Sequence, residues 1–279
     1  MSDILTVDKL CKSYEKFRLD NVSFSLEKGK ITGFIGRNGA GKTTTLKSLL
    51  NFVHPDSGEI NFFGKNFSEA ENEIKQKIGF VSGGMDCYIK SKLRTISTTT
   101  KRFYPEWDEK AYKKYLELFS LDESKTPSQL SAGMKVKYSL ALALSHNAQL
   151  LILDEPTSGL DPVSRDELLD VFLELCSGGK TILFSTHITS DLDKCADNII
   201  YIKNGRILAQ DNMEHYTAGY RLLELDDEGA QILKDKLIGC KKSRHGWSAL
   251  IKTMDCKDIP QAQPADLEDI MVHMEKEEE

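Results

Sequence analysis

The sequence predicts an α/β protein whose largely parallel sheet is covered by helices on both faces. Four apolar runs, at residues 31–35, 150–153, 181–185 and 199–202, have the composition of strands that are buried on both faces. A glycine-rich loop follows the first run and leads into residues 43–52, which have helical composition. Buried strands that alternate with helices are typical of this fold class.

Further strands are expected on either side of these runs. Val22, Phe24 and Leu26 alternate with polar residues and are followed by a Lys-Gly turn, which predicts a half-buried strand. Asn204-Gly205 predicts a tight hairpin that leads into another strand at residues 206–208. The last buried run is therefore expected to have an antiparallel neighbour.

Between residues 85 and 149 the apolar pattern becomes helical. Two stripes have helical spacing, namely Tyr112, Tyr115, Leu116 and Phe119, and then Val136, Leu140, Ala143 and Leu144. Because strand patterns return at residue 150, the simplest interpretation is an inserted helical subdomain at about residues 85–149.

Beyond about residue 213 the chain predicts a small α+β unit. We expect a strand at residues 220–225, a helix near 228–237 and a hairpin around 244–247. A final helix would place one apolar stripe on one face: Leu267, Ile270, Met271 and Met274. We therefore divide the chain into a first domain at residues 1–212 and a small accessory domain at residues 213–279.

Composition and charge narrow the class of protein. The 279 residues are 40% hydrophobic and 29% charged, which is typical of a folded globular chain. The formal net charge is −6 and basic residues are interspersed with acidic ones, so we expect no nucleic-acid partner. The N-terminus lacks the pattern of a secretory signal, and polar residues interrupt the longest apolar stretch, near residues 140–153. Any membrane role is expected to come through a partner.

The loop at residues 36–43, Gly-Arg-Asn-Gly-Ala-Gly-Lys-Thr, has the spacing of a phosphate-binding loop. It follows a predicted strand and opens a predicted helix, which is the context that this motif requires. Its glycines let backbone N–H groups surround a polyphosphate, and Lys42 brings a cation to the β- and γ-phosphates. Thr43 offers its hydroxyl to Mg²⁺, so ATP with Mg²⁺ is the predicted ligand.

A second motif places two carboxylates, Asp154 and Glu155, directly after the buried run at residues 150–153. Open α/β sheets build their sites at the carboxyl ends of their strands. An isolated Asp-Glu pair at a strand end is often a simple surface feature, but here it accompanies a phosphate-binding loop. We therefore expect Asp154 to hold Mg²⁺, directly or through water, and Glu155 to polarise the attacking water.

Together these motifs resemble the nucleotide-binding domains of ABC transporters, over about residues 1–212. Residues 154–162, Asp-Glu-Pro-Thr-Ser-Gly-Leu-Asp-Pro, resemble the Walker B motif and D-loop of that family. Residues 185–187, Ser-Thr-His, resemble its switch segment, which would place His187 at the γ-phosphate. The resemblance implies a P-loop NTPase (RecA-like) core with an antiparallel β subdomain and an inserted helical subdomain.

Two further segments resemble parts of the family's site. Tyr14 lies where the family keeps an aromatic side chain that stacks on adenine. Residues 130–134, Leu-Ser-Ala-Gly-Met, resemble the signature motif, with Ser131 and Gly133 retained at the head of a predicted helix. The resemblance implies that this segment meets the γ-phosphate of the opposite subunit in a head-to-tail dimer. One chain would then lack a complete site.

The resemblance assigns roles residue by residue. Lys42, Glu155 and His187 are the expected catalytic residues, and Thr43 and Asp154 are the expected Mg²⁺ ligands. The residues expected to bind the nucleotide are Tyr14, Gly36, Arg37, Asn38, Gly39, Ala40, Gly41, Lys42, Thr43, Thr44, Ser131, Gly133 and Asp161.

Two departures from the commonest family pattern are informative. Ala132 and Met134 replace a glycine and a glutamine of the signature, and in this they resemble the exporter-associated branch. Residues 264–270 also resemble the tail of exporter-type ATPases. Gly83 and Gly84 stand where the family usually has a glutamine or an acid, and a glycine has no side chain with which to ligate Mg²⁺ or hold water.

The sequence therefore predicts the ATP-hydrolysing subunit of an ABC exporter for drugs, peptide antibiotics or lipids. It would be cytoplasmic, peripheral on the inner face of the cell membrane, and paired with an integral membrane permease as a homodimer or a heterodimer. A soluble ABC ATPase fits less well, because the segment between Lys42 and Asp154 leaves room for a helical subdomain alone. A slow or inactive nucleotide-binding regulatory module is the alternative that Gly83 and Gly84 leave open.

Overall fold

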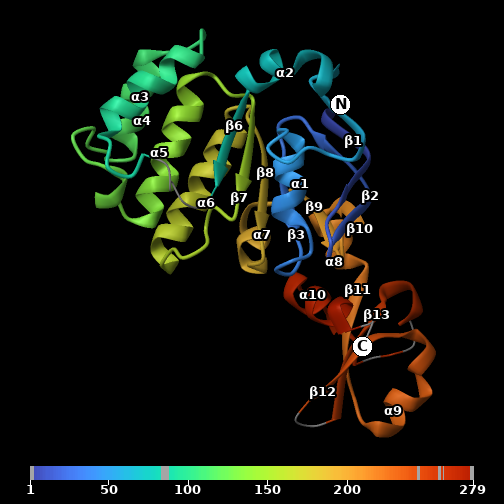
Figure 1. Ribbon diagram of the computed structural model, residues 1–279. Coiled ribbons are helices and arrows are strands. Elements are labelled where there is room, and N and C mark those ends of the chain that lie inside the picture. Colours follow the sequence, from blue (N-terminus) through green and yellow to red (C-terminus); the bar gives the residue numbers. More distant parts are fainter. Residues whose placement is uncertain (1–2, 83–87, 244–245, 257–258, 260, 277–279) are drawn as a thin grey trace.

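The computed structural model describes residues 3–82, 88–243, 246–256, 259 and 261–276. These residues form three sheets with helices around them (Figure 1). A six-stranded sheet lies at the centre, a four-stranded sheet from the N-terminal part lies beside it, and another four-stranded sheet forms the C-terminal part. Within the described ranges, no helix has the length and apolar character needed to span a bilayer.

The central sheet has the strand order β10-β9-β3-β8-β7-β6. Its strands are β3 (Ile31–Ile35), β6 (Ile78–Ser82), β7 (Leu150–Asp154), β8 (Thr181–Thr186), β9 (Asn198–Lys203) and β10 (Arg206–Asn212). All neighbouring pairs are parallel except β9 and β10. Those two form the predicted hairpin, in which Asn204 and Gly205 have φ angles of 48° and 75°. Every residue of β3, β7 and β8 is buried, which confirms the predicted cover on both faces.

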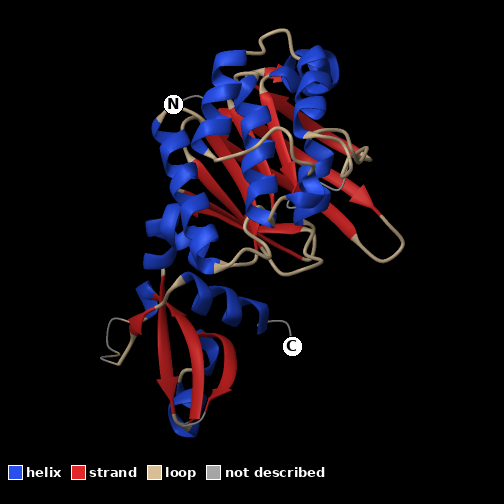
Figure 2. Ribbon diagram, turned by 90° about the vertical axis from the view of Figure 1, so that its left-hand side faces the viewer, coloured by secondary structure: helices blue, strands red, loops and turns tan. Residues whose placement is uncertain are grey.

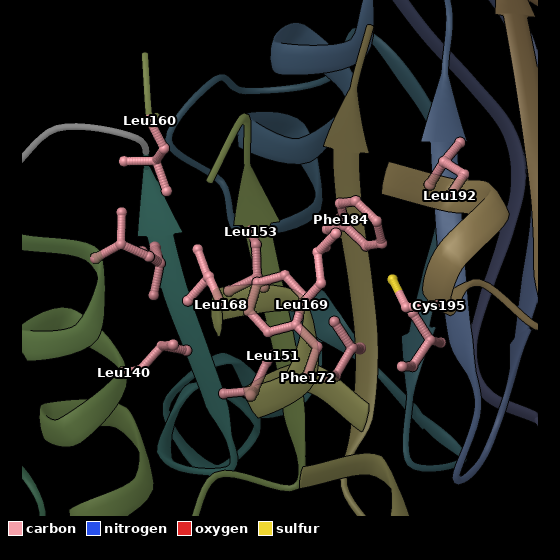
Figure 3. Packing of buried hydrophobic residues seen from close by; sticks show 14 of the residues in the cluster. Leu140, Leu151, Leu153, Leu160, Leu168, Leu169, Phe172, Phe184, Leu192 and Cys195 are labelled. Atoms are coloured by element: carbon pink, nitrogen blue, oxygen red, sulfur yellow. The ribbon is translucent and has the colours of Figure 1, made fainter. Parts of the chain in front are cut away.

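Alternate residues of these strands face two different hydrophobic cores. The helices on one face are α5 (Ala132–Ser145), α6 (Pro162–Ser177) and α7 (Thr189–Cys195). Leu151 and Leu153 of β7 pack on that face, where Figure 3 shows them beside Phe172 of α6. Leu150 and Ile152 pack on the opposite face with α1 (Lys42–Leu49) and the N-terminal sheet. The two-residue period of a strand thus joins both cores through one sheet.

The N-terminal sheet is antiparallel and has the order β2-β1-β4-β5. Its strands are β1 (Asp3–Ser13), β2 (Arg18–Glu27), β4 (Ser57–Phe62) and β5 (Lys65–Asn66), and α2 (Phe67–Gln76) follows them. Val22, Phe24 and Leu26 are all buried in β2, as their alternation predicts. Irregular register in β1 around Lys9, which has a φ angle of 48°, interrupts the alternation that would reveal this strand in the sequence.

Helices α3 (Leu93–Thr100), α4 (Glu109–Leu118) and α5 lie together at the β6 end of the central sheet (Figure 1). Short 3₁₀ turns at Lys101–Phe103 and Pro127–Gln129 connect them. The predicted apolar stripes become the buried faces of α4 and α5. The Asp108 side chain caps α4 by accepting bonds from two backbone N–H groups, those of Lys110 and Ala111.

The C-terminal part begins after α8 (Met213–Ala218) and forms an antiparallel sheet of order β12-β13-β11-β14 (Figure 2). Its elements are β11 (Tyr220–Leu225), α9 (Asp227–Ile232), β12 (Leu237–Ser243), β13 (Gly246–Lys252), β14 (Gln263–Pro264) and α10 (Leu267–Lys276), with 3₁₀ turns at Lys234–Lys236 and Thr253–Asp255. The predicted hairpin is that of β12 and β13.

The helix expected near residues 228–237 is shorter than predicted. It ends at Ile232, and Leu237 already belongs to β12, where it pairs with Ile251. Cross-strand pairing therefore overrides the local helical composition of this segment.

One hydrophobic core runs from the central sheet into the C-terminal part. Leu192 and Ile199 of the central unit belong to the same buried cluster as Leu250 of β13 and Leu267 and Ile270 of α10. A second, small cluster inside the C-terminal sheet contains Leu223, Leu225 and Ile251. The C-terminal part thus shares half of its buried apolar side chains with the central unit, which holds α10 close to the central sheet.

The buried side chain of His146 predicts a pH-dependent stability. Its ring stacks on Tyr104 at a centroid distance of 3.8 Å, and its Nδ1 lies 3.1 Å from the Gln76 carbonyl oxygen. Burial lowers the pKa of His146 from 6.5 to about 4. Between pH 6.5 and pH 4 the imidazole therefore binds a proton in the unfolded chain but not in the folded one. The free energy of unfolding should keep its full value above pH 6.5 and fall as the pH is lowered toward 4, by up to about 3 kcal/mol.

Denaturant unfolding at a series of pH values measures this effect. His146→Phe keeps an aromatic ring but removes the titrating group, so the loss of stability toward low pH should shrink. His54→Gln, which changes an exposed histidine, should leave the pH profile as it is. Equal profiles for the wild type and His146→Phe would contradict the assignment to this residue.

Candidate active site

The phosphate-binding loop connects β3 to α1. Each of its three glycines is required, either by the backbone conformation or by close packing. Gly39 and Gly41 have φ angles of 86° and 116°, which residues with a side chain rarely adopt. A Cβ on Gly36 would lie 2.3 Å from the Ile202 carbonyl oxygen of the neighbouring strand β9. The loop is therefore packed against the central sheet as well as curved around the start of α1.

Lys42 is the first residue of α1 and its side chain returns into the loop. Its Nζ donates to the carbonyl oxygens of Gly36 at 2.6 Å and of Arg37 at 3.3 Å. The residue is only 5% exposed. Because the ammonium is shielded from water, its charge acts strongly on any anion that enters the loop.

Asp154 ends β7 directly opposite the start of α1. Its Oδ1 accepts a hydrogen bond from the Thr43 hydroxyl at 3.1 Å and another from the Ser185 hydroxyl at 2.7 Å. Asp154 and Ser185 are paired neighbours on the parallel strands β7 and β8. The two residues expected to bind Mg²⁺, Thr43 and Asp154, are thus brought together with their oxygens side by side.

Glu155 occupies an unusual backbone conformation for a residue with a side chain. Its φ angle is 50°, in the left-handed region. Its N–H lies 3.1 Å from both the carbonyl oxygen and the hydroxyl of Ser185, which hold the peptide in place. Backbone strain of this kind is characteristic of functional sites.

The Glu155 carboxylate joins two other loops. One oxygen lies 3.4 Å from Lys42 Nζ, and the other lies 2.9 Å from Nδ1 of His187, which follows β8. His187 is exposed on its outer side, whereas Lys42 is buried. The three residues predicted to be catalytic therefore meet at one point, at the carboxyl ends of β3, β7 and β8.

These groups face a cavity of about 590 Å³. The predicted residues that line it are Arg37, Asn38, Gly39, Gly41, Lys42, Thr43, Thr44, Glu155 and His187. Gly36 and Ala40 are buried in the loop and shape its curve without lining the cavity. The size and the ring of donors suit a bound polyphosphate.

Besides Gly36, Ala40 and Asp154, four predicted residues do not line this cavity. Tyr14 is 49% exposed in the turn between β1 and β2, and Phe17 and Lys16 from the same turn line the cavity instead. Ser131 accepts a hydrogen bond from the Met134 N–H as the N-cap of α5. Gly133 is buried against Leu160, and Asp161 is the N-cap of α6.

The structure also shows contacts that the sequence does not reveal. Ser185 binds both Asp154 and Glu155, and Ser158 lines the cavity. Thr157 donates a hydrogen bond of 2.6 Å to Asp191 of α7, which is only 1% exposed, and burial raises the pKa of this carboxyl group. This bond ties the segment after Glu155 to the helix after His187. The segment with Gly83 and Gly84 lies outside the described residues.

Comparison with known proteins places this geometry in a family. A model of the ABC transporter family matches residues 19–158. The bacitracin transport ATP-binding protein BcrA of Bacillus licheniformis is 32% identical over 240 residues, which cover 84% of this chain and 78% of that protein. The chain belongs to the ABC transporter ATP-binding family. The Nod factor export ATP-binding protein I of Burkholderia lata is 33% identical to this cassette over 201 residues, 70% of this chain and 66% of that protein.

A solved structure agrees with this ABC cassette in fold. The protein cbiO1 from Clostridium perfringens, described as part of the ABC transporter complex cbiONQ, superposes with a TM-score of 0.67 at 27% identity. The match covers 77% of this chain and 91% of that one. The cassette is accordingly an ATP-binding and ATP-hydrolysing subunit of an ABC transporter.

Ser185→Ala should weaken both the fold and the site. Its hydroxyl donates to Asp154 and accepts from the Glu155 N–H, so removing it leaves two buried groups with fewer partners. We expect the free energy of unfolding to fall by about 1–3 kcal/mol. ATP hydrolysis should fall as well, because Asp154 and Glu155 lose a common support. Denaturant unfolding and steady-state phosphate release measure the two effects.

Thr32→Val is the matched control. Thr32 lies on the adjacent strand β3, and its hydroxyl is buried without a hydrogen-bond partner in the described structure. Its removal should leave stability unchanged or slightly raised. If both variants lost the same stability and activity, the specific role given to the Ser185 hydroxyl would be wrong.

Proposed function

We propose that this cassette powers export by hydrolysing Mg-ATP between its own phosphate-binding loop and the signature segment of a second subunit. The observation that carries the proposal is the Glu155 carboxylate, which lies 3.4 Å from Lys42 Nζ and 2.9 Å from His187 Nδ1. A carboxylate, a buried ammonium and a histidine around one cavity are the groups that in-line attack of water on a γ-phosphate uses.

Each group has a distinct role in that attack. Glu155 orients the water and accepts its proton, because its carboxylate is held at a fixed point by the backbone bonds to Ser185. Lys42 neutralises charge on the β- and γ-phosphate oxygens from within the loop. His187 supports the Glu155 carboxylate from the side and reaches the γ-phosphate from the edge of the cavity.

The residues present fit a Mg²⁺ ion. The Thr43 hydroxyl and the Asp154 carboxylate are hard oxygen ligands that already lie 3.1 Å apart. Mg²⁺ in nucleotide sites is commonly held by one or two protein oxygens together with phosphates and water, so a larger ligand cluster is not needed. When bound, the ion would neutralise charge that builds up on the β- and γ-phosphates.

A second subunit would complete the site. Ser131 stands exposed at the N-terminus of α5, a helix of 14 residues whose first N–H groups favour an anion. Neither Ser131 nor Gly133 lines the cavity formed by Lys42 and Glu155 in the same chain. We therefore assign Ser131, Gly133 and Asp161 to the contact with the opposite subunit's nucleotide, and Tyr14 stays a prediction for adenine stacking.

The names of two relatives favour export as the direction of transport. One acts in bacitracin transport and another in Nod factor export. We propose a drug, peptide-antibiotic or lipid substrate, carried by a separate membrane permease on whose cytoplasmic side the cassette docks. Residues 1–212 would form the nucleotide-binding domain of this assembly, with the helical subdomain at about 85–149. Residues 213–279 would form its accessory domain.

Glu155→Gln tests the assignment of the catalytic carboxylate. Loss of a general base should slow phosphate release at least about hundredfold, while the amide still fits beside Lys42 and ATP still binds. Because bound ATP is then not consumed, size-exclusion chromatography with Mg-ATP should show a dimer.

Two controls accompany this variant. Lys42→Ala should lose nucleotide binding itself, and Glu117→Gln, an exposed change on α4, should behave as the wild type. A Glu155→Gln protein that hydrolyses ATP at the wild-type rate would overturn the mechanism. A variant that stays monomeric with Mg-ATP would mean that the second subunit is a different chain.

Thr43→Val tests the proposed metal ligands. Removing the hydroxyl takes away one oxygen beside Asp154, so half-maximal hydrolysis should require several-fold more Mg²⁺. Thr45→Val is the control on the same helix, because the Thr45 hydroxyl bonds to the Gly41 carbonyl oxygen and faces the protein interior. Titration of phosphate release with MgCl₂ measures the effect. An unchanged Mg²⁺ requirement in Thr43→Val would remove Thr43 from the ligand set.

A further inference from the structure

Helix α10 reaches from the C-terminal sheet to the phosphate-binding loop. Figures 1 and 2 show it between that sheet and the lower end of the central unit, and Figure 1 shows β3 and α1 close above it. It also packs against α7, the helix that follows His187. The last part of the described chain is thus brought beside the nucleotide motifs of its first part.

On one side α10 is fixed to the C-terminal sheet. His273 is only 3% exposed, and its Nδ1 lies 2.6 Å from the Gly239 carbonyl oxygen of β12. Its Nε2 lies 3.1 Å from the Ser248 hydroxyl of β13. Because the imidazole bonds to two strands of that sheet, α10 and the sheet are expected to move together.

On the other side the end of α10 is fixed to β9 of the central sheet. Lys203 Nζ donates to the Met274 carbonyl oxygen at 2.8 Å, and the Tyr201 hydroxyl donates to Glu275 Oε1 at 2.8 Å. Burial raises the pKa of Tyr201, so its phenol stays protonated and remains a donor. The buried Tyr201 hydroxyl therefore fixes the orientation of the Glu275 carboxylate.

The second oxygen of this carboxylate faces the phosphate-binding loop. Glu275 Oε2 lies 3.9 Å from Nη1 of Arg37, and the side chains are 14% and 65% exposed respectively. Arg37 lines two cavities, that of the nucleotide motifs and a neighbouring one of about 540 Å³ that His187, Met271 and Glu275 also line. The Arg37 guanidinium thus stands between the α10 carboxylate and the place proposed for the phosphates.

We propose that Glu275 is a positioning residue that draws Arg37 toward α10, and that the C-terminal unit sets the affinity of the cassette for ATP in this way. The proposal rests on the proposed function, because it assumes that ATP binds in the cavity lined by Lys42 and Glu155. A guanidinium shared with a carboxylate offers less net positive charge to a triphosphate. Any movement of the C-terminal sheet that shifts α10 changes how far the Arg37 guanidinium is held by the Glu275 carboxylate and how far it is available to the triphosphate.

Glu275→Gln in the full-length protein is the first test. It removes one negative charge but keeps an oxygen that can accept from the Tyr201 hydroxyl, so α10 should stay in place. The Arg37 guanidinium then becomes available to the nucleotide, and the KM for Mg-ATP should fall about two- to fivefold, with kcat changed less than about twofold. The difference should shrink as salt rises, since Arg37 is largely exposed.

A double-mutant cycle decides whether the effect passes through Arg37. In an Arg37→Ala background, Glu275→Gln should no longer change the KM for Mg-ATP. Glu268→Gln is the matched control, because Glu268 lies on α10 and lines the same 540 Å³ cavity, and among the described residues it forms no ion pair. Its replacement should leave the KM near the wild-type value.

The outcomes separate this inference from the proposed function. The inference is wrong if Glu275→Gln and Glu268→Gln change the KM equally, or if Glu275→Gln has the same effect with and without Arg37. A fall in kcat and in thermal stability with no change in KM would also overturn it, because that result assigns Glu275 a structural role only. If the wild type shows no phosphate release that Lys42→Ala abolishes, the proposed function itself fails.

Discussion

The nucleotide site depends on the hydrogen bonds by which Ser185 holds the end of strand β7. Its hydroxyl binds the Asp154 carboxylate, and the same hydroxyl and its carbonyl oxygen receive the N–H of Glu155. These bonds keep Glu155 in a left-handed backbone conformation, with φ at 50°. That turn directs its carboxylate toward Lys42 and His187. Because β7 and β8 are adjacent parallel strands, the sheet itself provides the rigid frame for this arrangement.

The same frame connects the site to the rest of the chain. The Thr157 to Asp191 bond links the segment after Glu155 to α7, and α7 packs against α10 of the C-terminal part. From there, His273 continues the contact into the C-terminal sheet, while Glu275 returns to Arg37 of the phosphate-binding loop. A set of contacts therefore connects the segment after Glu155 with the end of the described chain, and through it we propose that the C-terminal unit influences ATP binding.

Residues that act through the local backbone were predictable, and those that act through packing were not. The glycines of residues 36–43 and the pair Asp154-Glu155 could be recognised from the sequence, because a phosphate-binding loop and a strand end each require particular residue types at neighbouring positions in the chain. Tyr14 and Phe17 show the limit of prediction from the sequence. Both are aromatic residues of one turn, and only the three-dimensional packing brings Phe17 to the cavity. The helix expected near residues 228–237 ends early for a related reason, because Leu237 pairs with a strand that lies later in the chain.

By itself the sequence determined the fold class, the family and most of the residues that line the cavity beside the phosphate-binding loop, because these follow from apolar periodicity and from short motifs whose parts are neighbours in the chain. Only the tertiary structure decided that Ser185 supports both acidic residues, that Asp191 ties the segment after Glu155 to α7 and that Glu275 faces Arg37. Each of these contacts joins segments far apart in the chain. Their partners are selected by strand order and by the docking of α10, which no local pattern encodes.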